Sequence, residues 1–175
     1  MRGMADTFSG MKSTLLTSLL LMSQMWVVFA VVFATIAASG EEARSPVVIV
    51  ANASVTEDNL SLSALRRIFM AEQQYWPDRS RIILLVQAPN AYEREIVLDK
   101  IYGMTENEYK KYWVAKMFRA EVPSGPKIVF SVNMARELVQ SMKGAITFIR
   151  ADEVQGYGKI IRVDGKLPNE PGYPL

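Results

Sequence analysis

The sequence predicts an α/β fold, a single three-layer domain in which helices cover both faces of a mixed central sheet. Short apolar runs, rich in β-branched residues, alternate along the chain with segments whose apolar residues recur at helical spacing. The apolar runs are nearly continuous, which is typical of strands buried on both faces. No internal repeat or second linker interrupts the alternation, so we expect one domain after residue 40.

Four strands are expected from the apolar runs. Pro46 precedes the first, residues 47–50, in which valine and isoleucine favour extended backbone. A second run of five apolar residues covers 82–86, and a third covers 145–149. The last and shortest strand is expected at 160–163, just before a polar turn.

Four helices are expected between these strands, each preceded by a residue whose side chain can cap the helix N-terminus. The predicted caps are Ser61, Asn90, Thr105 and Ser131. Asn90 and Glu93 have the spacing of a capping box, in which each side chain satisfies a backbone N–H group near the other residue. Thr105 begins its helix with the same spacing. The stretches between the helices and strands carry the Gly, Pro and Asn residues typical of turns.

Residues 1–40 have the features of a segment separate from this domain. Basic residues at Arg2 and Lys12 precede an apolar stretch over 15–37, which ends in small residues. This pattern predicts a secretory signal peptide. An uncleaved N-terminal membrane anchor is the alternative, because the stretch approaches the ~20 apolar residues that span a bilayer.

With either kind of leader, the rest of the chain is expected in the periplasm. We expect the domain to cover 41–167 and a flexible, proline-rich tail to cover 168–175. The absence of cysteine fits a periplasmic protein that needs no disulfide.

The composition excludes many functions, because the chain contains neither cysteine nor histidine. Disulfides, thiolate chemistry, zinc sites with nitrogen or sulfur ligands and imidazole catalysis are all ruled out. The 20 basic and 18 acidic residues give a net charge of +2, which is no signal for nucleic-acid binding. We therefore expect a protein that is not an enzyme and that has no metal site, no cofactor and no nucleic-acid partner.

A series of short motifs in chain order carries a family resemblance. The first is Ser-Leu-x-x-Leu-Arg-x-Ile-Phe over 61–69, and an aromatic-Pro-Asp turn at Trp76 follows it. The later motifs are Tyr112-Trp113 with Phe118, a proline-containing loop before Ser131, and Gly144-Ala145-Ile146. Together these motifs resemble the phosphate-binding proteins of phosphate ABC transporters, in the type 2 periplasmic binding protein superfamily. The resemblance covers nearly all of residues 47–163 and is closest to their short, single-domain relatives.

The resemblance implies one lobe of a type 2 periplasmic binding protein and a small oxyanion such as phosphate as ligand. In the family, a glycine- and serine-rich loop after the strand at 82–86 opens a helix whose N-terminus holds the phosphate. Here that loop reads Pro89-Asn90-Ala91-Tyr92. Glycines usual in the family are also replaced, by Ala71, Arg79 and the pair Arg119-Ala120.

Six residues are the candidate ligand contacts, and each also has a purely structural interpretation. The candidates are Asn90, Ala91, Tyr92, Arg94, Ser54 and Ser131. Asn90 can equally be only a helix cap, and Arg94 can be a solvated surface residue. Ser54, with Asn52, is expected at the same cleft edge or in an ordinary turn. Ser131, with Asn133, can serve only to cap its helix.

Three further clusters are expected to be structural. An aromatic stripe at helical spacing is typical of a core rather than of a stacking platform, and it comprises Tyr109, Tyr112 and Trp113, with Met117 expected on the same side of the helix. Three carboxylates share one helix without any feature that pairs them for catalysis, and they are Glu93, Glu95 and Asp99. A basic group is expected to be solvated, and it comprises Lys110, Lys111, Lys116 and Arg119.

Two functions follow from these expectations. The first is a periplasmic solute-binding-protein-like module that binds phosphate or another small oxyanion in transport or sensing. The second is a structural or interaction module of an envelope complex, with the same fold but without a solute. A single lobe leaves one side of a ligand in water, so a membrane transporter, a sensor, an envelope complex or a second copy of the chain is expected as partner.

Overall fold

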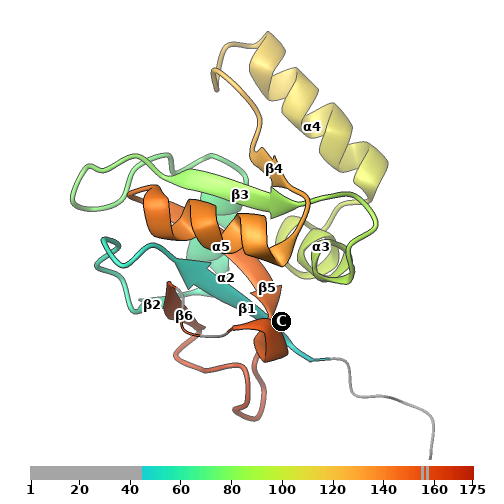
Figure 1. The fold of residues 1–175 in the computed structure, drawn as a ribbon. Helices are drawn as coiled ribbons and strands as arrows, with labels where there is room; N and C mark the ends of the chain where they lie inside the picture. Colours follow the sequence, from blue (N-terminus) through green and yellow to red (C-terminus); the bar gives the residue numbers. More distant parts are fainter. Residues whose placement is uncertain (1–44, 155, 157) are drawn as a thin grey trace, which may run out of the picture. The chain divides into compact units, whose positions relative to one another are not determined.

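A six-stranded mixed sheet forms the centre of the computed structural model, which describes residues 45–154, 156 and 158–175 (Figure 1). The strand order is β2-β6-β1-β5-β3-β4. The strands are β1 Val47–Ala51, β2 Asn59–Leu60, β3 Ile83–Gln87, β4 Lys127–Val129, β5 Ala145–Arg150 and β6 Lys159–Val163. β1 is antiparallel to both of its neighbours, β5 and β6, whereas β3 is parallel to β5 and β4.

The four predicted strands are confirmed, and two short strands were not predicted. β2 and β4 have two and three residues and pair at the two edges of the sheet. β2 has no apolar run, and the run that includes β4, Ile128-Val129-Phe130, is shorter than the four residues from which a strand is predicted.

The four predicted helices are also confirmed. They are α2 Leu62–Phe69, α3 Tyr92–Val97, α4 Glu106–Phe118 and α5 Val132–Ser141. α3 continues directly into a π-helical turn, η1 Leu98–Tyr102, and a 3₁₀ turn, η2 Ala151–Glu153, follows β5. The two helical turns leave no signal in the periodicity that separates them from ordinary α-helix.

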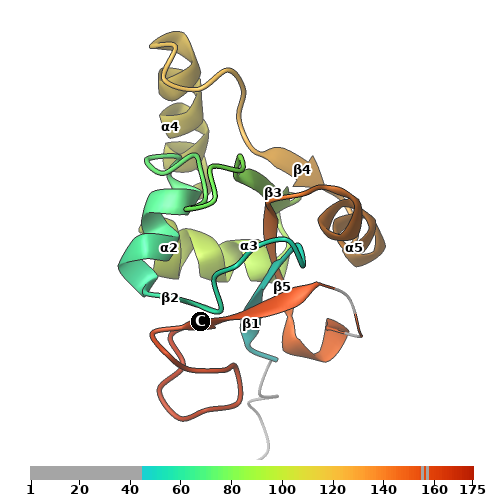
Figure 2. The same ribbon diagram turned by 90° about the vertical axis from the view of Figure 1, so that its left-hand side faces the viewer.

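The helices cover both faces of the sheet, as predicted (Figure 2). Alternate residues of β1 separate the two cores: Val47, Ile49 and Ala51 join α2, α3 and α4 in the larger one. Val48 and Val50 point the other way and pack with α5 in the smaller one. Residues 45–175 therefore form a compact unit with hydrophobic cores of its own.

Three of the four predicted caps form. The hydroxyl groups of Ser61 and Ser131 each accept the N–H group three residues later, at 3.1 Å. Thr105 and Glu108 form the predicted capping box. The prediction for Asn90 is wrong: Ala91 occupies the cap position of α3, no side chain caps it, and Asn90 lies in a left-handed turn with φ 70°. Asn90 therefore lies one residue before the cap position, and its side chain does not accept a hydrogen bond from the first N–H groups of α3.

The positions at which glycine is usual in the family keep a glycine-like backbone. Ala71, Arg79 and Ala120 have positive φ angles of 52°, 66° and 54°. A side chain with a Cβ atom is strained in this left-handed region, by roughly 1–2 kcal/mol per residue. The three turns therefore have the backbone conformation that glycine adopts most easily, although none of the three residues is glycine.

Two predicted segments lie at the ends of the chain. The predicted leader, 1–40, lies outside the described residues. The predicted tail, 168–175, is described, and its Tyr173 and Leu175 pack against the larger core. Its mobility stays a prediction, as do the domain boundaries. Among the described residues, no helix combines the length and the apolar character needed to cross a bilayer.

Candidate functional site

The predicted ligand residues lie beyond opposite ends of the strands of the sheet. Asn90 follows the C-terminal end of β3 and Ser131 follows that of β4; the two strands are parallel, and the N–H of Ala88 donates to the carbonyl of Val129 at 2.9 Å. Ser54 follows β1, which runs the other way. The expectation that Ser54 lines the same cleft edge as Asn90 is therefore wrong, because the central strand is antiparallel to its neighbours.

Asn52 and Ser54 have structural roles at their own edge. The Asn52 side chain is buried, and its amide donates to the carbonyls of Val139 and Gln140 at 2.6 and 3.1 Å. The Ser54 hydroxyl accepts the N–H of Gly144 at 3.2 Å. These contacts hold the end of β1 against the C-terminal turns of α5, which is the ordinary-turn alternative for this pair.

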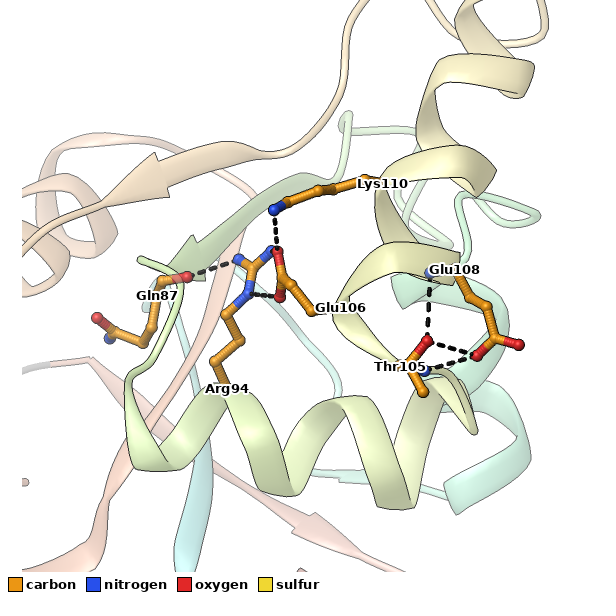
Figure 3. A network of polar contacts seen from close by, with 6 residues as sticks. All are labelled: Gln87, Arg94, Thr105, Glu106, Glu108 and Lys110. Carbon is orange, nitrogen blue, oxygen red and sulfur yellow. Dashed lines mark hydrogen bonds and ion pairs between the residues drawn. The ribbon is translucent and has the colours of Figure 1, made fainter.

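Arg94 is buried rather than solvated, with only 3% of its surface exposed. Its Nε and Nη2 atoms donate to the two carboxylate oxygens of Glu106, at 2.8 and 3.0 Å (Figure 3). Its Nη1 atom donates to the carbonyl of Gln87 at 2.7 Å, and the guanidinium lies 4.6 Å from the centre of the Tyr109 ring. The charge of Arg94 is thus neutralised within the protein, and its donors have partners.

A cavity of about 450 Å³ lies beside this ion pair. Its charged lining consists of one guanidinium, that of Arg94, and four carboxylates, those of Glu95, Asp99, Glu106 and Glu108. Glu108 accepts hydrogen bonds from the N–H and hydroxyl of Thr105, which hold the pKa of its carboxyl below the usual value. The cavity is therefore negatively charged at neutral pH, and an oxyanion is repelled from it.

The first turn of α3 carries negatively charged side chains. Glu93 and Glu95 lie in its first turn, where carboxylates interact favourably with the positive end of the helix dipole. Glu93 faces Arg150 at 3.8 Å, whereas Asp99 faces Lys100 at 3.0 Å. These carboxylates have different partners, so they do not form the closely spaced pair that acid–base catalysis uses.

Ser131 lies at the N-terminus of α5, where the charges differ from those at the start of α3. Its hydroxyl caps α5, and the first turn of this ten-residue helix contains no acidic residue. Asn133 is exposed. The capping alternative for Ser131 is confirmed, and the N-terminus of α5 remains free of competing carboxylates.

The aromatic stripe of α4 belongs to the core, as predicted. Tyr109 and Trp113 are each 6% exposed, and the Tyr109 and Tyr102 rings meet edge to face at 5.0 Å. The expectation of a solvated Lys116 is wrong: it is 7% exposed, and its Nζ lies 3.1 Å from Glu121. Its aliphatic chain follows the core side of α4, and the ammonium group lies 5.5 Å from the centre of the Tyr112 ring.

An exposed apolar face on α4 was not expected from the sequence, and it includes Met117, which was expected on the core side. Val114 is 61% exposed, Met117 41% and Phe118 92%. Val114 and Phe118, four residues apart, lie on the side of α4 away from Tyr109 and Trp113, whereas Met117 follows Trp113 by four residues and lies between the two sides. A helix that is apolar on two faces is typical of one with neighbours on both sides.

Comparisons with known structures place this fold among the substrate-binding proteins of phosphate ABC transporters, which confirms the predicted fold. A phosphate transport receptor from Vibrio cholerae matches with a TM-score of 0.57 and 19% identity, over 71% of this chain and 48% of its own. A putative phosphate ABC transporter substrate-binding protein from Clostridium perfringens, solved with bound phosphate, matches with a TM-score of 0.60 and 16% identity, over 74% and 49%.

PstS from Borrelia burgdorferi matches with a TM-score of 0.55 and 13% identity, over 71% of this chain and 49% of its own. The chain therefore spans about half the length of these solved proteins, in agreement with a single lobe of the fold. No family model matches the sequence, and no curated protein matches it.

Proposed function

We propose that this chain is an exported, non-enzymatic interaction module built on one lobe of a phosphate-receptor fold. The observation that supports it best is the outer face of α4, which leaves Val114, Met117 and Phe118 in water in a chain about half as long as its structural neighbours. A phenylalanine ring that is 92% exposed gains the full free energy of burial only when another surface covers it, about 2 kcal/mol for such a side chain.

The lining of the predicted ligand edge supports the same proposal. Arg94, the one cation lining the cavity beside α3, is already paired with Glu106, and the remaining charged groups there are carboxylates. A site that holds phosphate with unpaired donors needs the opposite arrangement. The fold is retained, while the charges at this edge favour exclusion of an oxyanion.

Binding of phosphate or another small oxyanion is the second candidate, favoured by the start of α5. This helix begins at the same sheet edge as α3, Ser131 lies at its N-terminus, and its first turn carries no carboxylate. The neighbour from Clostridium perfringens carries phosphate. One helix end contributes only about 0.3–1 kcal/mol, so this candidate requires a partner that supplies a second wall.

The partner in either case is expected in the cell envelope. The neighbours are receptors of ABC transporters, and the apolar segment over 15–37 predicts export by a signal peptide or retention by an anchor. A membrane transporter, a sensor complex or a second copy of the chain fits this proposal. The near-neutral charge of the chain argues against nucleic acid.

Two measurements on protein purified from the envelope test the proposal. Titration calorimetry with phosphate and with sulfate is expected to give no binding heat at millimolar concentrations. Crosslinking in cells, followed by affinity purification, is expected to recover one stoichiometric partner, which is lost in Phe118→Ser. Ile160→Ser is the matched control, because Ile160 is an exposed apolar residue on β6, away from α4.

Retention of the partner by Phe118→Ser would contradict the role of α4. Tight, saturable binding of phosphate that Ser131→Ala weakens would instead favour the second candidate. Phe118→Ser changes an exposed side chain, whereas Ser131→Ala also removes the cap of α5 at a cost of about 1 kcal/mol, so circular dichroism is used to check that both variants are folded.

A further inference from the structure

A second cavity lies at the opposite end of β3 from Asn90. It has a volume of about 320 Å³ and is bounded by the start of β3, the start of β4, the loop over 122–126 and the core side of α4. This volume lies in the range of small-molecule sites, about 300–1,000 Å³. The sequence did not predict a cavity between these elements.

The charged lining of this cavity is entirely basic. Arg81 and Lys127 line it, and no aspartate or glutamate does so. Within the described residues, neither of these two side chains takes part in an ion pair or a hydrogen bond. The nearby carboxylate of Glu121 is already paired, with Lys116 and Arg119. The cavity is thus the reverse of the acidic one beside α3: its cations are free to meet an anion.

Much of the cavity lining is apolar. The apolar part includes four buried side chains, those of Ile68, Leu84, Trp113 and Val122. Two amides also line the cavity: the Nε2 of Gln73 donates to the carbonyl of Tyr75 at 3.3 Å, and that of Gln74 donates to the carbonyl of Glu121 at 3.2 Å. Within the described residues, the Oε1 atom of neither amide accepts a hydrogen bond, so each can accept one from a ligand.

We propose that this cavity binds an apolar organic carboxylate: the carboxylate pairs with Arg81 and Lys127, and the apolar part covers Trp113 and Leu84. The same chemistry occurs in the C-terminal residue of a peptide, whose amide N–H suits the glutamine oxygens, and in a free short-chain acid. The inference goes beyond the proposed function and does not depend on it, since it uses neither the outer face of α4 nor the edge at Asn90.

The test is calorimetric titration of the purified protein with matched ligands. The peptide N-acetyl-Ala-Leu with a free carboxylate is expected to bind one to one, and the same peptide with a C-terminal amide is expected to bind at least tenfold more weakly. The double substitution Arg81→Gln and Lys127→Gln is expected to weaken binding of the carboxylate at least tenfold. Lys111→Gln is the matched control, since Lys111 is an exposed lysine of α4 that does not line the cavity.

Hexanoate distinguishes the two sources of the carboxylate. Tighter binding of the peptide supports a peptide C-terminus, and equal or tighter binding of hexanoate supports a free acid. The proposal is overturned if neither ligand binds at millimolar concentration, if the amide binds as well as the carboxylate, or if the double variant binds like the parent. Both substituted residues are exposed, so circular dichroism is expected to show an unchanged fold.

Discussion

Arg94 and Glu106 form a two-point ion pair that joins α3 to the first turn of α4 (Figure 3). The guanidinium is almost fully buried, whereas the carboxylate is 31% exposed and also lies 3.7 Å from Lys110. A buried charge is tolerated only when its partner is in place. A residue expected to face either a ligand or solvent is therefore part of the packing that positions α4.

Removal of the carboxylate is expected to destabilise the fold strongly. Glu106→Gln leaves the buried guanidinium of Arg94 without a counter-charge, and we expect the free energy of unfolding to fall by about 3 kcal/mol. Lys110→Ala removes only an exposed partner of the same carboxylate and is expected to change it by less than about 0.5 kcal/mol. Urea denaturation of both variants measures the difference. Equal losses would show that the pair with Arg94 has no special weight.

Glycine is expected to stabilise the protein at the left-handed turns. Ala71→Gly and Ala120→Gly each remove the strain of a Cβ atom at positive φ, worth roughly 1–2 kcal/mol, against a cost of about 0.4–1 kcal/mol in the unfolded chain. We expect a net gain of about 0.5–1 kcal/mol each. Ala64→Gly, inside α2, is the control and is expected to lose about 1 kcal/mol. Thermal unfolding measures whether each substitution raises or lowers the stability. A loss of stability at both turns would show that the Cβ atoms of Ala71 and Ala120 are not strained.

Gly144 is expected to tolerate no side chain. It has φ 76°, and a Cβ atom there would overlap the backbone carbonyl oxygen of Arg81, which cannot move away as a flexible side chain can. Gly144→Ala is expected to cost about 3 kcal/mol or more, from strain and from displacement of neighbouring backbone. Gly125→Ala, where nothing lies within 4 Å of the added atom, is expected to cost less than about 0.5 kcal/mol. Comparable denaturation midpoints for the two variants would contradict this close approach.

Stability is expected to fall in alkali because of the buried tyrosines. Burial raises the pKa of Tyr109 to about 12 from 10.0 in the unfolded chain, so the native state holds its proton more tightly. The contribution of the Tyr109 hydroxyl to the free energy of unfolding is fully present below pH 10. It is lost as the pH rises through 12, by about 2–3 kcal/mol in total. Tyr109→Phe is expected to have a flatter dependence over this range. Chemical denaturation from pH 9 to 12 tests it, and parallel curves would count against the burial effect.

The layers and most elements of the fold could be predicted because they depend on local patterns. The continuous run of β1 is buried on both faces, and the caps at Ser61, Thr105 and Ser131 use contacts within one turn of helix. β4 could not be predicted, because its pairing with β3 depends on a strand forty residues away rather than on its own three residues. The two short edge strands, β2 and β4, are extended because they pair with neighbouring strands of the sheet.

The candidate site was harder to predict because it depends on charges brought together from distant elements. The carboxylate that neutralises Arg94 lies on another helix, and the reversed direction of β1 places Ser54 at the far edge. Neither fact follows from spacing along the chain. The outer face of α4 left a signal in the sequence, since Val114 and Phe118 are apolar and lie four residues apart on one side of the helix. It was not predicted because only the side with the aromatic stripe was considered apolar.

The position of β1 in the middle of the sheet has a consequence for how the protein is made. This strand is the first to leave the ribosome, yet Val47 pairs with Arg150 and Ile49 with Ile161, more than a hundred positions later. The centre of the sheet cannot form until β5 and β6 have been synthesised, because these strands are the two neighbours of β1. The central strand of the sheet is therefore without its pairing partners for most of the time that the domain is being synthesised.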